Sequence, residues 1–412
     1  MSTASGSTGS GTRKRLDHVD AMRPIKQAAV ISTHALVYFS PLSTSLAAGA
    51  LLTLTHFSRD AFLFVSACML AYSYQNQSSL KLAPYWKRRF ISVGIPYLVW
   101  SFLYFPIALM TPTNTFPYYR VPWGAMFSQH GLHELLFAIA TGYYHLYFLL
   151  VLLEFYLFFP LVLALLRRWR RWHVQVLVVA LVWQVVWHYL MRHGHPSFTV
   201  SAKTETRLVF SYPLYLLGGV IAAFHLDEMH DWIIRHYRAI LAWTLVSAVV
   251  PIVIDAVYRH VYVPKYLIPG GDPFSPVVIP YDVGAILCVY LLGVYLVSPR
   301  RSARTRAITQ SGSDAAYGIY LSQMVWILFL HRWMQKWGVL GHVPWLFVMV
   351  MAVIVTYLLG FFFSALVART PLARAVVGRT QVPWRTLLPH LRSDALAPHH
   401  DYGPGPMDLS DV

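Results

Sequence analysis

The chain has 412 residues, of which 57% are hydrophobic, 15% aromatic and only 12% charged. This composition is too apolar for a soluble domain of that length, so it excludes an ordinary soluble enzyme and predicts a polytopic membrane protein. The formal net charge of +16 does not indicate nucleic-acid binding here. In a membrane protein, what matters is which loops carry the Lys and Arg residues.

Apolar runs of about 20 residues predict one all-α bundle of membrane-spanning helices. Ten such runs are centred near residues 36, 63, 100, 156, 182, 216, 248, 288, 322 and 355. No internal repeat and no second globular domain is visible. We therefore expect a flexible tail at residues 1–14, a membrane domain at 15–370, and a tail at 371–412 that is first basic and then disordered.

The distribution of Lys and Arg predicts the orientation of these spans. Ten spans place both termini on one side of the membrane. If that side is the cytoplasm, 24 of the 33 Lys and Arg residues lie in cytoplasmic segments, eight lie in outer loops, and Arg59 lies inside a span. This bias follows the positive-inside rule and predicts cytoplasmic termini. The Ser-, Gly- and Thr-rich start has no apolar core, so we expect no cleaved signal peptide.

The first span, DAMRPIKQAAVISTHALVYF (20–39), contains an arginine near its start and a histidine inside it. Arg23 and His34 are eleven positions apart, which on an α-helix is a rise of about 16 Å and leaves them within about 20° of one face. Arg23 could hold the phosphates of a cytoplasmic ligand, and a neutral His34 could accept a proton. Equally, His34 could be a hydrogen-bonded packing residue, and Arg23 a rim anchor paired with Asp20.

Four further segments follow in the chain: DAFLFVSACMLAYSY, with Asp60 and Ser66, then YWKRRFISVGIPYLVWS, YYHLYFLLVLLEFYLFFPL and SDAAYGIYLSQMVWI. Together with the Arg, ten intervening residues and His of the first span, they resemble the acyltransferase family 3 membrane proteins in the family's own order. The resemblance covers about residues 15 to 335. Three positions depart from it: Ala67 replaces a common Gly, Ser92 a basic residue, and Gln323 a His.

The resemblance implies transfer of an acyl group, commonly acetyl from its coenzyme A thioester, to carbohydrate hydroxyls of envelope polysaccharides, lipid-linked glycans or secreted glycosides. It also implies the bacterial cytoplasmic membrane. Acyl-CoA would be a substrate rather than a tightly bound cofactor, and we expect no metal. Arg23, with Arg88 and Arg89 on the same predicted side, could bind the phosphates of coenzyme A. The basic turn could equally serve topology alone.

On this reading, His34 is either the general base for the acceptor hydroxyl or a nucleophile that forms an acyl-histidine. Asp60 could orient a cation or a hydroxyl. The neighbouring Arg59 should lie on another helix face and serve a different partner.

Three further residues could contact the acceptor. Glu154, inside the fourth span, could pair with an intramembrane cation or bind sugar. Tyr144 and His145 are expected at the outer mouth, where they could bind a sugar ring or belong to the interfacial aromatic belt.

Two other readings stay open. The first is a transporter or flippase for a glycan or small anionic solute, in which sparse buried charges are also ordinary, although no paired half-repeats with broken helices are visible. The second is a non-catalytic membrane sensor. Replacement of His34 by Ala or Gln separates the sensor from an acyltransferase, because the sensor should retain its function and the enzyme should not.

Overall fold

A computed structural model describes residues 16–42, 44–77, 79–110, 124, 126–193, 205–261 and 274–383. Its longer elements are all α-helices, and the described residues contain no β-strand. The helices are α1 (Asp17–Phe39), α2 (Leu46–Thr55), α3 (Phe57–Tyr74), α4 (Leu82–Arg89), α5 (Ile95–Met110), α6 (Gln129–Thr141), α7 (Tyr147–Arg168), α8 (His173–His193), α10 (Pro213–Phe224), α11 (Leu226–Arg235), α12 (Tyr237–Val261), α13 (Ile279–Val297), α14 (Ala303–Lys336), α15 (Trp345–Val367) and α16 (Ala373–Val376). The predicted all-α class is confirmed.

Within the described residues, six helical segments are long and apolar enough to cross a membrane. They are α4 with α5, which a π-helical turn at Phe90–Gly94 joins, and α7, α8, α12, α13 and α15. The four other predicted span centres fall in α1, α3, α10 and α14. These helices are more polar or, like α10 with 12 residues, shorter. A multi-pass membrane bundle is thus confirmed, whereas the number of ten spans and the orientation stay predictions.

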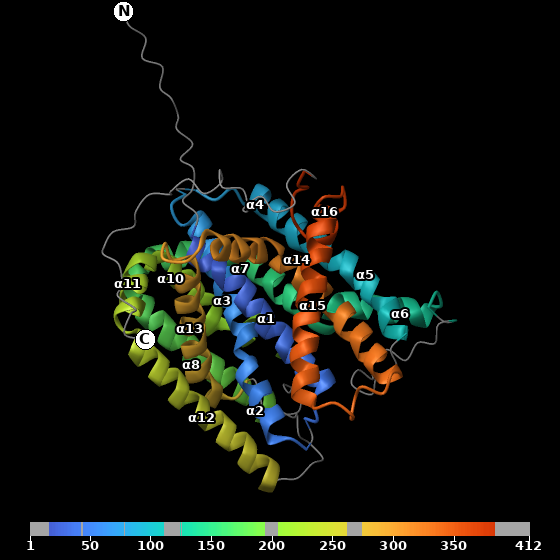
Figure 1. Ribbon diagram of the computed structural model, residues 1–412. Helices are drawn as coiled ribbons and strands as arrows, with labels where there is room; N and C mark the ends of the chain where they lie inside the picture. The colour runs from blue at the N-terminus through green and yellow to red at the C-terminus, as the bar shows by residue number, and fades with distance from the viewer. Residues whose placement is uncertain are drawn as a thin grey trace, which may run out of the picture.

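Helix α1 lies in the middle of the bundle (Figure 1). It packs against α2, α3, α13, α14 and α15, and it runs unbroken through Pro24. Ile31, Ala35 and Leu36 on this helix are fully buried. Because protein surrounds α1 on several sides, its polar side chains can face other side chains instead of lipid.

Helices α3 and α10 pack closely, which matters for the polar residues between them. Gly219 allows this approach, since a Cβ added there would lie 2.3 Å from the Phe64 carbonyl oxygen. The contact brings the first turn of α10, with Tyr212 just before it, beside the start of α3.

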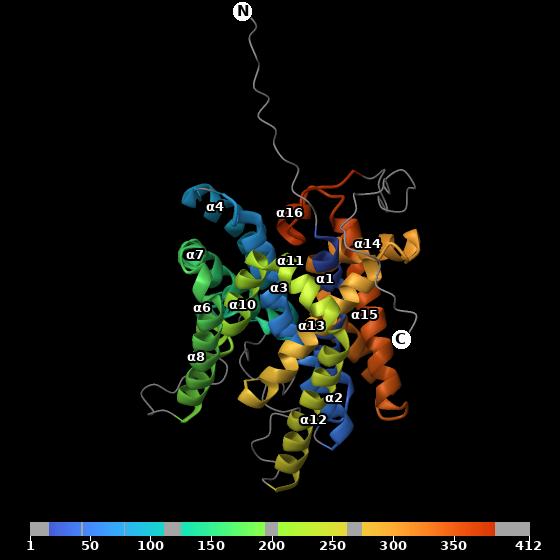
Figure 2. The ribbon, with the colours of Figure 1, turned by 90° about the vertical axis from the view of Figure 1, so that its left-hand side faces the viewer.

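Helices at the edge expose apolar side chains, as lipid-facing helices do. Examples are Val178 and Val182 on α8, Leu245 and Val246 on α12, and Phe362 on α15. Helix α12 follows the lower left edge in Figure 1, and α8 the left edge in Figure 2.

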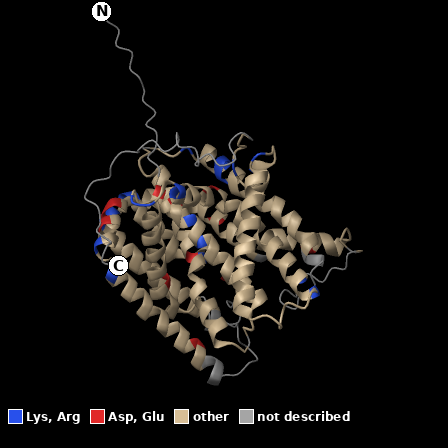
Figure 3. Ribbon diagram, in the orientation of Figure 1, with Lys and Arg blue, Asp and Glu red and all other residues tan. Residues whose placement is uncertain are grey.

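Basic residues gather mainly at the upper end of the bundle in Figure 3. We call this the basic end, because the last turns of α4, α7 and α16 carry Lys87, Arg88, Arg89, Arg167, Arg168 and Arg374. The turn between α1 and α2 marks the opposite end.

The fold continues past residue 370. The Trp100 indole donates to the Val376 carbonyl (2.8 Å), and Arg379 Nη1 donates to the Asp314 carbonyl (2.9 Å). Residues 371–383, predicted as the start of the C-terminal tail, therefore pack on α5 and α14. Residues 1–14 and 384–412 lie outside the described residues.

Candidate functional site

His34 and His145 meet inside the bundle. Their ring centroids are 6.0 Å apart in an edge-to-face arrangement. His34 comes from the second half of α1 and is half-buried, whereas His145 precedes α7 and is only 3% exposed. The sequence places these residues 111 positions apart, and the fold makes them neighbours.

His145 does not lie at an outer mouth, as predicted, but in the interior. Gly142, with φ of 76°, ends α6 and turns the chain inward; a Cβ there would lie 2.2 Å from Tyr147 Cα. Tyr143 and Leu146 on either side are buried. The bulky apolar neighbours, which suggested an aromatic belt, instead draw this short segment into the core.

Tyrosines hold the His145 segment in place. The Tyr320 hydroxyl donates to the His145 carbonyl (2.6 Å), and the Tyr104 hydroxyl donates to the Leu321 carbonyl (2.7 Å). Their rings lie 4.8 Å and 5.5 Å from the imidazole. Tyr320 thus anchors the histidine segment.

Neither ring nitrogen of His145 makes a hydrogen bond within the described part of the chain. The Tyr320 and Leu321 carbonyls lie near the ring, but outside hydrogen-bonding geometry. A buried imidazole in this condition can exchange a proton with a substrate or with His34.

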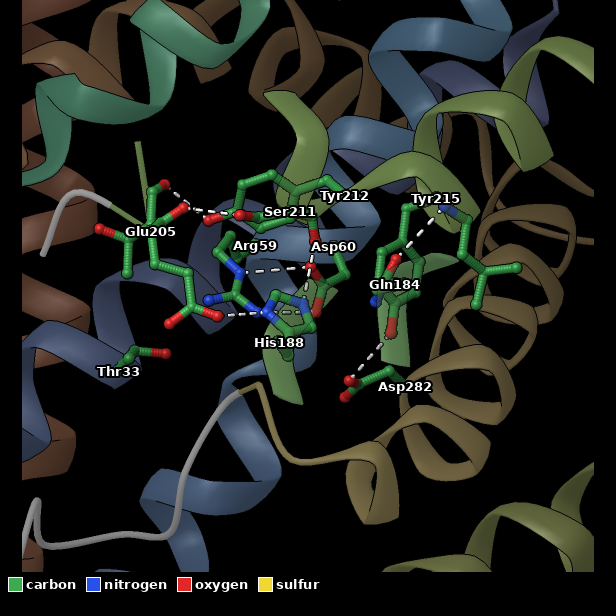
Figure 4. Close-up of polar contacts among 12 residues, drawn as sticks. Thr33, Arg59, Asp60, Gln184, His188, Glu205, Ser211, Tyr212, Tyr215 and Asp282 are labelled. Carbon is green, nitrogen blue, oxygen red and sulfur yellow. Dashed lines mark hydrogen bonds and ion pairs between the residues drawn. The ribbon is translucent and has the colours of Figure 1, made fainter. Parts of the chain in front are cut away.

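A second polar cluster lies beside α3 (Figure 4). Arg59 donates to both carboxylate oxygens of Asp60, from Nε (3.2 Å) and Nη2 (3.3 Å). The expectation that these neighbours serve different partners is wrong: the long arginine side chain folds back from the first turn of α3. Its guanidinium lies over the rings of Phe274 (4.3 Å) and Tyr212 (5.0 Å), so the charge is buried between an anion and aromatic faces.

The cluster extends to α13 through a second carboxyl group. Asp282 is buried and accepts a hydrogen bond from the Tyr215 hydroxyl (3.2 Å). Asp282 also lies close enough to Asp60 and Arg59 to interact with them electrostatically. Since two nearby carboxyl groups repel when both are charged, Arg59 is the group that compensates negative charge in this cluster.

His188 and Glu205 form a second buried pair in the same cluster. His188 Nδ1 contacts a carboxylate oxygen of Glu205, and Nε2 lies 3.2 Å from the Ser211 carbonyl. Because a carbonyl can only accept, Nε2 donates this hydrogen bond. Both ring nitrogens of His188 therefore have partners inside the bundle.

The sequence analysis missed His188, Glu205, Asp282 and Tyr215. His188 and Asp282 lie in apolar runs, WQVVWHYL and IPYDVGAIL, where an ionisable residue is itself a signal of a polar site. Glu205 and Tyr215 carry no comparable local signal, since Glu205 follows a stretch of mostly polar sequence and Tyr215 is an ordinary aromatic in an apolar helix.

The basic end holds Arg23 and Arg89. Arg23 Nη2 pairs with Asp20 (3.2 Å), the i,i+3 partner that the sequence suggested, and remains 37% exposed. The Arg89 guanidinium lies between the rings of Tyr74 and Tyr156, at 5.3 Å and 5.9 Å. Both arginines lie near Tyr156. Arg88 is exposed and does not share these contacts.

Two buried polar residues of α1, Lys26 and Gln27, lie between Arg23 and His34. Lys26 is buried with its ammonium 3.2 Å from the centroid of the Phe62 ring. Gln27 donates to Gln323 (3.0 Å), the residue that stands where the resembling family usually has His. Sequence analysis did not single out Lys26, although a lysine in an apolar span is a recognisable signal.

Two other predicted residues lie elsewhere. Glu154 Oε2 accepts from the Val209 amide (2.8 Å) and so fastens the segment that follows Glu205, rather than pairing with a cation. The backbone of Tyr144 belongs to the short helix Tyr144–Leu146, and its side chain lies outside the described residues.

The sequence also matches a known protein family. A family model for an acyltransferase domain matches residues 17–361. The chain belongs to the acyltransferase 3 family. This confirms the resemblance seen in the sequence and identifies the protein as a membrane acyltransferase. No curated protein and no solved structure matches the chain.

This acyltransferase thus has three polar regions: two arginines at the basic end, a histidine pair in the interior, and the buried cluster of Arg59, Asp60, His188 and Glu205. Among the described residues, no three His, Cys, Asp or Glu side chains gather closely enough to hold a metal ion. Both members of the interior pair are histidines. An imidazole can act as an acid, a base or a nucleophile, so this region is suited to acid–base or nucleophilic chemistry.

Proposed function

We propose that this acyltransferase moves an acyl group, commonly acetyl, from acyl-CoA to a hydroxyl of a carbohydrate or envelope glycan, with His34 as general base. The observation that carries the proposal is the His34–His145 contact inside the bundle, on the same helix as Arg23 at the basic end. An acyl transfer to a hydroxyl needs a group that removes the hydroxyl proton as the oxygen attacks the thioester carbonyl.

The donor would approach from the basic end. Coenzyme A is anionic, and Arg23 and Arg89 converge near Tyr156, where they can contact phosphate oxygens by charge-assisted hydrogen bonds. Arg88 is exposed and does not share the contacts of Arg23 and Arg89, so it contributes only to the overall electrostatic field. On this proposal the basic end faces the cytoplasm, both termini are cytoplasmic, ten spans cross the bacterial cytoplasmic membrane, and no cofactor is tightly bound.

The acceptor would approach His34 from the opposite end. Next to His34, Thr33 donates to the Thr55 carbonyl (3.2 Å), which joins this part of α1 to the end of α2. Asp60, engaged with Arg59, would orient the region rather than touch the reacting hydroxyl.

The test is free-thiol release from acetyl-CoA by the purified protein in detergent, with and without pools of envelope glycans. We would compare wild type, His34→Ala, and His133→Ala, a control at a 75% exposed histidine of α6. We expect acceptor-dependent thiol release that His34→Ala lowers at least about 100-fold and that His133→Ala leaves unchanged. Coenzyme A binding that persists in His34→Ala would assign the loss to the chemical step.

The transporter reading has one specific observation in its favour, the buried cluster of Arg59, Asp60, His188 and Glu205, since intramembrane charges often mark solute or proton pathways. Absence of thiol release with every acceptor, together with glycan movement across vesicles that contain the protein, would support it over acyl transfer.

A further inference from the structure

His145 differs from two other buried histidines of this protein. Both ring nitrogens of His188 have partners, the Glu205 carboxyl group and the Ser211 carbonyl. Both nitrogens of His173 have partners too, His225 (2.9 Å) and the Leu166 carbonyl (2.9 Å). His145 is as buried as these, yet neither nitrogen is hydrogen-bonded within the described residues. An unmade hydrogen bond to a buried polar atom costs about 1–3 kcal/mol, so a purely structural role does not account for a histidine here.

The surroundings hold the backbone of His145 and leave its buried ring nitrogens without hydrogen bonds within the described residues. Tyr320 uses its hydroxyl on the His145 carbonyl, and Tyr104 uses its hydroxyl on the Leu321 carbonyl. The ring is therefore positioned by aromatic edges instead of by hydrogen bonds. Among the described residues, the other imidazole in ring contact with it is His34.

Acyl transfer requires a proton to move between two atoms that a single fixed imidazole cannot easily reach in turn. The proton leaves the acceptor oxygen, and it must end on the sulfur of the departing coenzyme A. These two atoms lie on different sides of the reacting carbonyl carbon, and His34 is fixed on the central helix α1. A second imidazole beside it can accept a proton on one nitrogen and release one from the other.

We propose that His145 is a second catalytic residue, which relays the proton from His34 to the thiolate of the leaving group. The acceptor oxygen forms a bond to the carbonyl carbon while its proton passes to His34. As the carbon–sulfur bond breaks, the protonated His34 gives its proton to one nitrogen of neutral His145, whose other nitrogen releases its own proton to sulfur. Hydroxyl and thioester become ester and thiol, and both imidazoles end neutral. This inference rests on the proposed function.

The relay can be tested with two acyl donors, one whose leaving thiolate needs a proton and one whose leaving thiolate does not. The donors would be acetyl-CoA and S-phenyl thioacetate, whose aryl thiolate departs without a proton. With acetyl-CoA, His145→Gln and His34→Gln should each lower kcat about 100-fold or more. With the aryl thioester, His145→Gln should recover to within about threefold of wild type, because its step is bypassed, while His34→Gln stays impaired. His145→Phe, which keeps the ring contacts with Tyr104 and Tyr320, should behave as His145→Gln.

Several outcomes would overturn the relay. Full activity of His145→Gln with acetyl-CoA would do so, as would equal losses with both donors while coenzyme A binding is intact. If the variants do not fold, kcat of the wild type can be measured in mixtures of light and heavy water. Transfer of two protons in the rate-limiting step makes kcat depend on the fraction of heavy water along a curve. A linear dependence would contradict the relay. Wild type without thiol release under any condition would overturn the proposed function, and the relay with it.

Discussion

Arg59 and Asp60 are consecutive residues of α3, and the guanidinium of one binds both carboxylate oxygens of the other at 3.2 and 3.3 Å. Neighbours on a helix normally point about 100° apart. Here burial decides: the Asp60 side chain is 1% and the Arg59 side chain 13% exposed, and the arginine is long enough to turn back. The pair neutralises itself at the start of the helix, close to the second carboxyl group of Asp282.

Removing one partner of the Arg59–Asp60 ion pair should lower the stability of the protein more than removing both partners. Asp60→Asn leaves the buried guanidinium without its carboxylate, so we expect a loss of about 3–5 kcal/mol in stability. Arg59→Gln combined with Asp60→Asn removes both charges and should regain part of that loss. Thermal unfolding in detergent measures both, and a double variant no more stable than Asp60→Asn would contradict the pairing.

The contact between α3 and α10 can be tested at two adjacent glycines. A Cβ at Gly219 would lie 2.3 Å from the Phe64 carbonyl, whereas a Cβ at Gly218 would meet its nearest atoms at ordinary distances of 3.7–3.8 Å. Gly219→Ala should therefore destabilise the protein by about 1–3 kcal/mol, and Gly218→Ala should be close to neutral or slightly stabilising. Equal melting temperatures for the two variants would show that the helices do not approach so closely.

The turn at Gly142 should control activity through His145. Its φ of 76° and the 2.2 Å approach to Tyr147 Cα leave no room for a side chain. Gly142→Ala should shift the His145 segment and lower thiol release more than about tenfold. Gly338→Ala is the matched control, with φ of 65° but open space around it. It should cost about 1 kcal/mol from backbone strain alone and keep full activity; a similar activity loss in both variants would refute the link to His145.

The arginines at the basic end should differ in how much each contributes to coenzyme A binding. Arg23→Gln and Arg89→Gln should each weaken coenzyme A binding about tenfold, a typical effect of losing one charge-assisted hydrogen bond to phosphate. Arg88→Gln should change it less than about twofold, because its exposed charge is screened. Equilibrium binding at two ionic strengths gives the comparison, and identical losses for Arg88 and Arg89 would argue against a local phosphate site.

The sequence alone determined the membrane class, the helical fold and the family. Hydropathy and helix periodicity depend on residues that are neighbours in the chain, so the ten apolar runs can be read directly, and each of their centres lies in a different helix. The spacing of Arg23 and His34 is likewise a property of one helix, and α1 holds both on an unbroken segment.

The tertiary structure decided the partners of these residues. Whether His145 lies at a membrane surface or beside His34 depends on a turn at Gly142 and on packing against α14. The His188–Glu205 pair and the Tyr215–Asp282 hydrogen bond join segments 17 and 67 positions apart. Such contacts follow from how close helices approach and from which polar groups burial leaves to satisfy one another, and neither is a local property of the chain.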